Sequence, residues 1–489
     1  MKKTLFIFNI LLCSFITAYC QGNNLWAFLS YASFNSPEGP YLETYLTVAG
    51  KSVQFVKIAN GKYQATVNIL MTFKKGGEIK AFKKYDLFSP EVEDTLHRDF
   101  NFVDQQRFLL QNGTYDFEIQ LSDKSKTIPA IPYSQSITLD FPDGKPTFSS
   151  IQLIKSYSKA EVPGNLTKSG FDLVPYTFTF YPKDENKLIF YVELYNMEKL
   201  LGKDQKFILS YFIESQEANL KLNNYVKVKK EITKEVNPIL TEISLENLAS
   251  GNYNLVIEAR NQQNELVTST KLFFQRMNPK ATMPLNEIQM TEIENTFAEK
   301  ITQIDSLKEY ISCTYPIATG IEKSFIRNSV KTVDMKTLQQ FFYGFWTQRD
   351  ATNPEQAWLT YKAAVYKVQV NFGTQVKKGY QTDRGRVYLE YGPPNTRSTQ
   401  YYDPSNYPYE IWQYYTLNNS QRNKKFVFYL PDRATNDFFL LHSDAIGEIN
   451  NQRWKIYLRN RIYTSSDIQD TQVIKSWGDF EEDYWALPN

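Results

Sequence analysis

The feature that most restricts the fold of this sequence is a succession of short alternating segments separated by turn residues. Between about residue 25 and residue 278, strand-like stretches are interrupted by clusters such as Ser36-Pro37-Glu38-Gly39-Pro40 and Asn112-Gly113. Asn-Gly steps are typical of β-hairpins because both residues tolerate positive φ. Several short strands at this spacing predict β-sandwiches.

One local pattern occurs twice and predicts two related sandwiches. Leu110-Gln111-Asn112-Gly113-Thr114-Tyr115 and Leu248-Ala249-Ser250-Gly251-Asn252-Tyr253 both read Leu-x-x-Gly-x-Tyr before an alternating strand. We expect the Leu to pack inward, the Gly to take a strained backbone angle and the Tyr to tie down the corner, as in the tyrosine corners of immunoglobulin-like domains. We therefore predict two immunoglobulin-like β-sandwiches, at residues 21–128 and 129–278.

Beyond the linker that starts at Asn278-Pro279 the pattern becomes helical. Apolar residues from Ile288 to Leu307 recur mostly at three- and four-residue steps. Asp334 is a candidate N-cap for a second helix, and Asn353-Pro354 is a candidate start for a third. The third helix carries an aromatic stripe from Trp358 to Phe372, which indicates a side that faces the core rather than a cofactor.

The pattern returns to strands after the third helix. The segments that we predict as strands are Val387–Tyr391, Tyr409–Tyr415, Lys425–Leu430 and Phe438–His442. Helices followed by strands indicate an α+β fold. We place a helical connector at residues 279–345 and an α+β domain at residues 346–489, so that the whole chain is multidomain.

The first twenty residues have the layout of a secretory signal peptide. Lys2-Lys3 is followed by the apolar stretch Leu5–Ile16 and by small residues at Ala18 and Cys20, which predicts cleavage after Cys20. The apolar stretch is too short to span a membrane, which takes about 20 residues. The alternative, a lipoprotein acylated at Cys20, is disfavoured because Tyr19 is bulky. We expect an exported protein without a transmembrane span.

Charge and cysteine content restrict the partners of the exported chain. Removing the signal peptide lowers the 55 Lys and Arg by two, so that they equal the 53 Asp and Glu. Neutrality argues against nucleic acid, which is bound by neutralising phosphates, and against steady attachment to anionic lipid. Cys313 is then the sole cysteine, which excludes an internal disulfide and favours a buried thiol over one paired with a partner protein.

The segment Gly379-Tyr380-Gln381-Thr382-Asp383-Arg384-Gly385-Arg386-Val387-Tyr388-Leu389-Glu390-Tyr391-Gly392-Pro393-Pro394 resembles the signature of the GWxTD domain family. Phe345-Trp346 and Arg349-Asp350 upstream, and Tyr409-Glu410-Ile411-Trp412 downstream, are also similar to it. Members are exported proteins of Gram-negative envelope lineages without an assigned molecular role. Tyr380 stands where the family name has Trp, and we expect this aromatic to keep a packing role.

The segment Gly379–Pro394 can also be interpreted from its residues alone, without the family resemblance. Gly379 is expected to end the long helix in a left-handed conformation. In the turn Thr382–Gly385, Asp383 is expected to accept backbone N–H groups while Gly385 relaxes the bend. Gly392-Pro393-Pro394 is expected to stop the following strand, because proline cannot donate to a ladder.

The chain shows no catalytic or metal-binding motif. It has no zinc-protease His pair, no nucleophile elbow, no phosphate loop and no Cys pair for zinc, and we predict neither cofactor nor metal. Its two histidines, His97 and His442, are each better explained as structural or solvated than as catalytic bases. Asp403 and Glu410 are a conceivable carboxylate pair for sugar hydrolysis, but that chemistry requires a set distance that sequence does not show.

Arg384 and Arg386 are the strongest functional candidates. On a strand, residues two apart project to one face, where two guanidiniums grip a carboxylate or phosphate. The alternative, which we favour, is ion pairing with Asp383, Glu390 or Glu410 to stabilise the turn. The candidate ligand-contact loop supplies tyrosines that either stack on sugar or peptide or fold over the core; they are Tyr401, Tyr402, Tyr407 and Tyr409.

Two functions follow from the sequence as hypotheses. The first is a binding or scaffold protein that holds an envelope protein partner in the periplasm or at the outer membrane of a Gram-negative bacterium. The second is an enzyme that acts on envelope glycan or peptide through the region Gly379–Trp412. The signature residues on which both depend are Gly379, Tyr380, Thr382, Asp383, Arg384, Gly385, Arg386, Gly392, Pro393, Pro394, Glu410 and Trp412.

Overall fold

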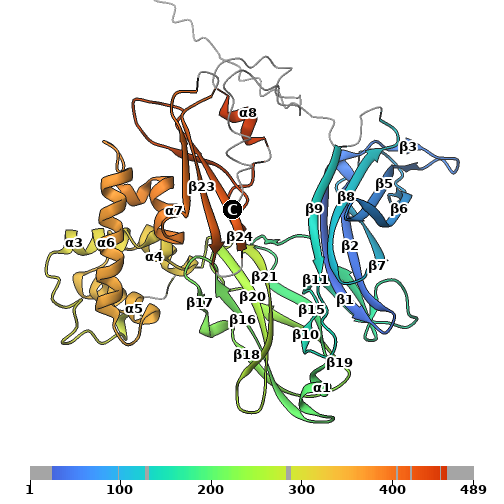
Figure 1. Ribbon diagram of the computed structural model, residues 1–489, viewed down its shortest axis with the longest axis horizontal. Coiled ribbons are helices and arrows are strands. Elements are labelled where there is room, and N and C mark those ends of the chain that lie inside the picture. The colour runs from blue at the N-terminus through green and yellow to red at the C-terminus, as the bar shows by residue number, and fades with distance from the viewer. Residues whose placement is uncertain are drawn as a thin grey trace, which may run out of the picture. The chain divides into compact units, whose positions relative to one another are not determined.

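The chain forms two compact units, Met1–Phe141 and Pro142–Asn489. A computed structural model describes residues 25–96, 98–126, 131–281, 283, 288–403, 406–418, 421–451 and 453–459. The predicted signal peptide and His97 lie outside the described residues. Figure 1 shows the elements of both units, and each unit is described here by itself.

The first unit is a β-sandwich. One sheet has the order β1-β2-β7 and the other the order β6-β5-β8-β9, and a core that includes Leu46, Phe73 and Phe117 lies between them. The strands are β1 (Ala27–Ser36), β2 (Gly39–Ala49), β5 (Thr66–Lys75), β6 (Glu78–Phe88), β7 (Asn101–Leu109), β8 (Gly113–Asp123) and β9 (Ile131–Leu139), with a short pair β3 (Val56–Lys57) and β4 (Tyr63–Gln64) and the 3-10 helix η1 (Gly50–Ser52). Because β9 pairs with β8, this unit extends past the boundary expected at residue 128.

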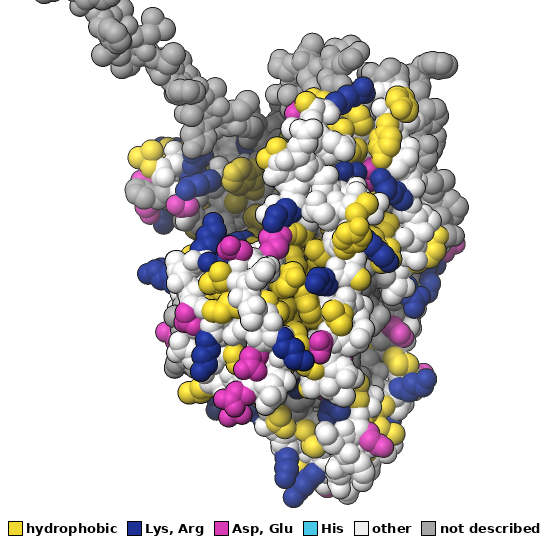
Figure 2. Space-filling view, turned by 90° about the vertical axis from the view of Figure 1, so that its left-hand side faces the viewer, with side chains coloured by type: hydrophobic (Ala, Val, Ile, Leu, Met, Phe, Trp, Pro, Cys, Tyr) yellow, Lys and Arg dark blue, Asp and Glu magenta, His cyan; other side chains and the backbone are white. Residues whose placement is uncertain are grey.

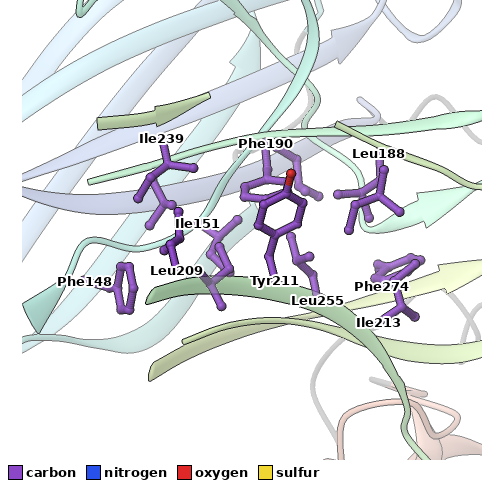
Figure 3. Packing of buried hydrophobic residues seen from close by; sticks show 14 of the residues in the cluster. Phe148, Ile151, Leu188, Phe190, Leu209, Tyr211, Ile213, Ile239, Leu255 and Phe274 are labelled. Atoms are coloured by element: carbon purple, nitrogen blue, oxygen red, sulfur yellow. The ribbon is translucent and has the colours of Figure 1, made fainter. Parts of the chain in front are cut away.

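A second β-sandwich begins the second unit. Its sheets have the orders β10-β15-β11-β13-β12, with β19 on β15, and β14-β21-β20-β16-β17, with β18 on β16. Figure 3 shows apolar side chains of both sheets meeting between them, among them Phe190, Tyr211 and Leu255. The elements are β10 (Thr147–Phe148), β11 (Gln152–Lys159), β12 (Thr167–Lys168), β13 (Phe171–Pro175), β14 (Phe180–Tyr181), β15 (Lys187–Tyr195), α1 (Met197–Leu201), β16 (Lys206–Ser215), β17 (Leu220–Lys221), η2 (Asn223–Tyr225), β18 (Lys227–Ile232), β19 (Val236–Ser244), β20 (Gly251–Arg260) and β21 (Leu266–Arg276).

Both tyrosine corners are present. The Tyr115 hydroxyl donates to the Gln111 carbonyl at 2.8 Å, and the Tyr253 hydroxyl donates to the Ala249 carbonyl at 2.9 Å. The leucines of both motifs are buried as expected. The expected glycine conformation holds only in the first motif, where Gly113 has a φ of 145°. In the second, the β-carbon position of Gly251 lies against the Tyr253 ring, so a small residue rather than a positive φ is needed.

Replacing Tyr253 or Tyr115 by Phe is expected to lower the free energy of unfolding of its own sandwich by about 1 kcal/mol, because each change removes one hydrogen bond, buried at Tyr253 and partly buried at Tyr115. The measurement is chemical denaturation of the full chain. Tyr133→Phe is the matched control, because the Tyr133 side chain is half exposed on β9. Equal effects at Tyr115 and Tyr133 would contradict the corner assignment.

A helical region follows the second sandwich and contacts it at the tyrosine corner. A β-carbon on Gly320 would lie 2.4 Å from the Ser250 carbonyl oxygen, so the start of α4 requires glycine at this approach. The helices are α3 (Ile304–Ser312), α4 (Gly320–Asn328), α5 (Met335–Arg349), α6 (Pro354–Phe372) and α7 (Asp383–Tyr391), with η3 (Tyr315–Ile317) and η4 (Gly379–Gln381). The boundary expected after residue 345 therefore falls inside α5.

The helix predictions are partly correct. Asp334 caps α5 by accepting the Thr337 N–H at 2.9 Å, and α6 begins at Pro354 as expected, although the Asn353 side chain makes no capping hydrogen bond. The apolar run that starts at Ile288 was expected to be helical to Leu307, but continuous helix begins only at Ile304. The earlier apolar residues still enter the core of this region.

The last sheet has the order β22-β23-β24-β25 and is covered on both faces. Val368 of α6 and Val387 of α7 pack with Trp412 on one face, and Trp454 of α8 packs with Ile411 on the other. The elements are β22 (Thr396–Gln400), β23 (Tyr409–Leu417), β24 (Gln421–Tyr429), β25 (Phe439–Ser443) and α8 (Trp454–Leu458). The C-terminal part is thus α+β.

Candidate functional site

Glu410 is the centre of the signature region and is fully buried on β23. Its Oε1 accepts hydrogen bonds from Arg384 at 2.8 Å, from Arg397 at 2.7 Å and from the Tyr401 hydroxyl at 2.7 Å. Its Oε2 accepts from the indole N–H of Trp412 at 2.9 Å. Burial raises the pKa of Glu410, but the two guanidiniums outweigh burial and the net pKa is lowered.

Arg384 reaches Glu410 from α7 and is enclosed by rings. Its guanidinium lies 3.9 Å from the centroid of Phe438 and 5.2 Å from that of Phe372. The side chain of Arg384 is 6% exposed and that of Glu410 is 0% exposed, so this pair is closed to solvent. Such a pair joins α7 to β23; it does not present a charge to a ligand.

The predicted strand Val387–Tyr391 is wrong, because these residues belong to the helix α7. Thr382 caps this helix by accepting the Gly385 N–H at 3.1 Å, and its hydroxyl donates to the Gly379 carbonyl at 2.8 Å. Residues two apart on a helix point in different directions. Arg384 and Arg386 therefore do not share a face, and the expectation that they jointly grip an anion fails.

Arg386 binds a second group of acids. Its two terminal nitrogens lie 2.7 Å from the two carboxylate oxygens of Glu448, and Nη1 lies 3.0 Å from Glu390. The Tyr391 hydroxyl also donates to Glu448, at 2.9 Å. The favoured expectation of ion pairing is confirmed for both arginines, with Glu410 and Glu390 as predicted partners and Glu448 as an additional one.

Glu390 is expected to make stability depend on pH. Burial and, to a smaller extent, the charges of Glu448 and Glu217 raise its pKa, the Arg386 charge lowers it, and the net pKa is about 7. Because the folded-state pKa exceeds the unfolded value, the folded state binds more protons between about pH 4.3 and 7. Stability should therefore fall as pH rises through this window, by an amount on the order of 3 kcal/mol. Glu390→Gln should remove most of this dependence in denaturation measured at pH 5 and pH 8, whereas an unchanged pH profile would contradict it.

Gly379 and Gly385 allow a close approach of backbones. A β-carbon on Gly385 would lie 1.9 Å from the Gly379 carbonyl oxygen, and one on Gly379 would lie 2.4 Å from the Val368 carbonyl oxygen. Gly379 was expected to end the long helix in a left-handed conformation, but α6 ends at Phe372 and Gly379 opens η4. Both positions therefore require glycine because a β-carbon would not fit there, and not because the backbone needs a positive φ.

The remaining signature residues also have structural contacts. Tyr380 packs against the cores of the helical region and of the last sheet, which is the packing role expected of it. Asp383 accepts a backbone N–H, as expected, but from Leu440 of β25 at 2.7 Å. Gly392, with a φ of 83°, ends α7 and is followed by Pro393-Pro394, so this run stops a helix instead of the expected strand.

The tyrosines of the candidate ligand-contact loop do not form a common surface. Tyr409 is buried, Tyr401 bonds to Glu410, and Tyr407 packs on Tyr429 with centroids 5.9 Å apart. Tyr402 is 89% exposed. These positions correspond to a loop folded largely over the core.

Other candidates for chemistry are also buried. Asp403 accepts from the Asn406 side chain at 2.9 Å and is 6% exposed. His442 accepts the Asn451 N–H at 3.1 Å and stacks on Trp454, and burial lowers its pKa to about 4. Cys313 is buried as expected, and burial raises the pKa of its thiol to about 12.

Two hollows on the described surface lie away from the signature. One of about 290 Å³ is on the second sandwich, lined in part by Tyr176 and Tyr181, and one of about 580 Å³ is in the helical region, lined in part by Phe297 and Tyr343. Neither is lined by a signature residue. Among the residues that the structure covers, no cluster of three or more His, Cys, Asp or Glu is arranged to hold a metal ion. In this part of the chain no helix is both long and apolar enough to cross a membrane.

Two residues of the site were not found by sequence reasoning. Arg397 supplies the second cation on Glu410, and Glu448 supplies the carboxylate that chelates Arg386. Glu448 lies 62 residues from Arg386 in the chain, in a loop without a motif. The signature segment gave no signal for either residue, because its two arginines are already matched in number by the acids Asp383 and Glu390.

Comparisons with known proteins do not assign the chain. No protein-family model matches it, and no curated protein matches it. Fibronectin type III-like modules of Clostridium thermocellum CbhA cover 48% of this chain and 85% of their own at 9% identity, with a TM-score of 0.14. A glycosyl hydrolase family 2 member from Bacteroides cellulosilyticus is matched over 48% of this chain at 12% identity, with a TM-score of 0.17. The match covers 28% of that enzyme, so the chain spans little more than a quarter of its length. The chicken interferon gamma receptor alpha chain is matched over its whole length, covering 52% of this chain at 9% identity, with a TM-score of 0.15. These scores are too low to support an assignment.

Proposed function

We propose that this protein is a non-catalytic binding or scaffold component of an assembly in the periplasm or at the outer membrane of a Gram-negative bacterium. The observation that supports this most is that the Glu410 carboxylate is buried and hydrogen-bonded to internal donors. A general acid or base must reach the substrate directly or through one water. Glu410 instead uses both of its oxygens on internal donors, and Arg384 beside it is closed to solvent. The GWxTD-like signature then stabilises the join between helices and sheet.

The architecture ahead of the signature suits the same role. We propose that both sandwiches are immunoglobulin-like, which their tyrosine corners at Tyr115 and Tyr253 support. Such modules serve as spacers or docking surfaces. The signal-peptide layout of the first twenty residues supports export, with cleavage after Cys20.

The experiment is recovery of the full chain from detergent-solubilised envelope after cross-linking in the producing cell. A scaffold component should bring down one or more envelope proteins in a fixed ratio to itself. A second exported protein with the same affinity tag, produced at the same level, is the control for non-specific recovery. Recovery of the chain alone, together with turnover of purified envelope glycan or peptide, would contradict the proposal and favour the enzyme.

A further inference from the structure

The smaller of the two hollows is lined by a buried tyrosine whose hydroxyl is unpaired within the part of the chain that the structure describes. We call this hollow of about 290 Å³ on the second sandwich the sandwich hollow. Figure 2 shows, for comparison, a side of the molecule on which hydrophobic side chains and charged side chains of both signs are mixed. Such a mixture is ordinary, because apolar atoms supply roughly 55–60% of a folded protein's surface. An unpaired buried hydroxyl is not, since the large majority of buried polar groups are hydrogen-bonded.

Tyr181 of β14 is this buried residue. It is 2% exposed, and its hydroxyl has no hydrogen-bond partner among the described residues. Burial raises the pKa of Tyr181, and the hydroxyl of Tyr176 and the carboxylate of Glu185 raise it further. Both of these neighbours line the sandwich hollow together with Tyr181. The Tyr181 hydroxyl therefore lies on the side of the hollow, which is the direction from which a ligand reaches it.

An ion pair at the sandwich hollow is able to open. Lys155 of β11 pairs with Glu185, and their side chains are 48% and 30% exposed. Pairs as exposed as this contribute little to stability, so a ligand displaces one at small cost. Because Glu185 is near the Tyr181 hydroxyl, turning the Glu185 side chain aside gives a ligand access to that hydroxyl.

The loop that carries Asp184 into the sandwich hollow is fixed by Arg276. The Arg276 guanidinium donates to the carbonyl oxygens of Pro182 and Glu185, at 2.6 Å and 2.7 Å. It also donates to Oδ1 of Asn186 at 3.2 Å. Asp184 lies in the middle of this loop, is exposed and lines the hollow. Because the loop is already ordered, little conformational entropy is lost when Asp184 binds a ligand.

The charged groups that line the sandwich hollow cancel. Lys155 and Lys187 are opposed by Asp184 and Glu185. A lining without net charge favours neither an anion nor a cation. Its ammonium groups donate hydrogen bonds and its carboxylates accept them, and a hydroxyl group pairs with either kind. The lining therefore favours a neutral ligand with several hydroxyl groups.

The Tyr176 ring supplies an aromatic wall. Its centroid lies 4.8 Å from that of Tyr181, and its hydroxyl donates to the Phe180 carbonyl at 2.7 Å, which fixes the orientation of the ring. The electron-rich face of a tyrosine ring attracts the C–H groups of a sugar. A volume of about 290 Å³ corresponds to about ten water molecules at roughly 30 Å³ each. This is enough room for one six-membered sugar ring.

We propose that the sandwich hollow binds one hexose residue of a neutral glycan, whose hydroxyl groups bond to Tyr181 and Asp184. The ligand class follows from the balanced charges, the aromatic wall and the volume. Glycan binding goes beyond the scaffold role and does not depend on it, because it is measured with the purified chain and without a protein partner.

The test is saturation-transfer NMR of the full chain with the methyl glycosides of glucose, galactose, mannose and N-acetylglucosamine. At least one of them should bind with a Kd on the order of 1 mM, the affinity expected for a ligand of this size. Glutamine, a zwitterion without net charge, is the control ligand and should bind more weakly. Binding of none of the four sugars overturns the proposal, and so does glutamine binding more tightly than all of them.

Variants of the lining test which groups hold the sugar. Asp184→Ala should raise the Kd by about tenfold and Tyr181→Phe by about fivefold, because a hydrogen bond to a charged group is worth more than one to a neutral group. Glu246→Ala, at an exposed acid of the same sandwich outside the hollow, should leave the Kd unchanged. A Kd that neither Asp184→Ala nor Tyr181→Phe changes overturns the proposal.

Melting temperatures separate loss of binding from loss of folding. Tyr181→Phe removes a hydroxyl that no described residue pairs with, so it should leave the melting temperature the same or higher. Tyr253→Phe breaks the hydrogen bond of a tyrosine corner in the same sandwich and should lower it. An equal fall in both variants overturns the proposal, because it would show that the Tyr181 hydroxyl is already bonded inside the protein.

Discussion

Replacing Glu410 by Ala is expected to lower the free energy of unfolding of the C-terminal α+β part by about 3–5 kcal/mol. The change leaves Arg384 buried against Phe372 and Phe438 without a counter-charge, and such a charge is far more costly than one in water. Arg397 also loses its counter-charge, but the cost there is smaller because its side chain is 39% exposed. The measurement is chemical denaturation of the full chain, with hydrogen exchange of β23 peptides to identify the part that unfolds.

Two controls make the Glu410 prediction specific. Glu242→Ala removes the partner of Lys187 from a pair whose side chains are 42% and 62% exposed, and it should cost less than about 1 kcal/mol. Adding Arg384→Met to Glu410→Ala should recover part of the loss, because the unpaired charge is then gone. If Glu410→Ala leaves stability unchanged but abolishes turnover of an envelope polymer, Glu410 is catalytic and the scaffold proposal fails.

Replacing Gly385 by Ala is expected to destabilise the same part by about 3 kcal/mol or more, although alanine is the better helix former. The new β-carbon would lie 1.9 Å from the Gly379 carbonyl oxygen and 2.7 Å from a methyl carbon of Val368. The first of these neighbours is backbone and cannot rotate away. η4 and α6 would both have to move, which would also disturb the position of Arg384.

The matched control for Gly385 is the other glycine in a helix interior, Gly344 of α5. Its β-carbon would meet Thr291 at 3.7 Å, an ordinary contact. Gly344→Ala should therefore stabilise the protein by roughly 0.5–1 kcal/mol, by lowering the entropy of the unfolded chain. Melting temperatures of the two variants should move in opposite directions, and a shared direction would contradict the steric argument at Gly385.

The sequence correctly predicted the features that depend on residues close together in the chain. Both tyrosine corners, the Asp334 cap, the start of α6 at Pro354 and the buried thiol of Cys313 were correct. Each depends on a few neighbouring residues and on burial of apolar side chains. The expectation that Arg384 and Arg386 form ion pairs was also correct, but it offered Asp383, Glu390 and Glu410 together as partners and did not say which arginine binds which acid.

Some segments have an apolar pattern that is compatible with two kinds of secondary structure, and the packing of the folded chain decides between them. Val387–Tyr391 alternates like a strand, yet the Thr382 cap and the space provided by Gly385 make it helical. The apolar steps after Ile288 suit a helix, but most of that stretch is built of turns that still bury their apolar residues. Neither outcome is visible without the neighbouring elements.

By itself the sequence determined the two β-sandwiches and, in the C-terminal part, the helices α5 and α6 and the strands β23, β24 and β25. Local hydrogen bonds and the period of apolar residues are encoded by neighbours in the chain. Only the tertiary structure decided that Arg384 and Arg386 serve separate carboxylates, because Glu410 and Glu448 approach them from strands and loops distant in sequence. Long-range electrostatic pairing depends on where folded elements meet, and no local pattern specifies that.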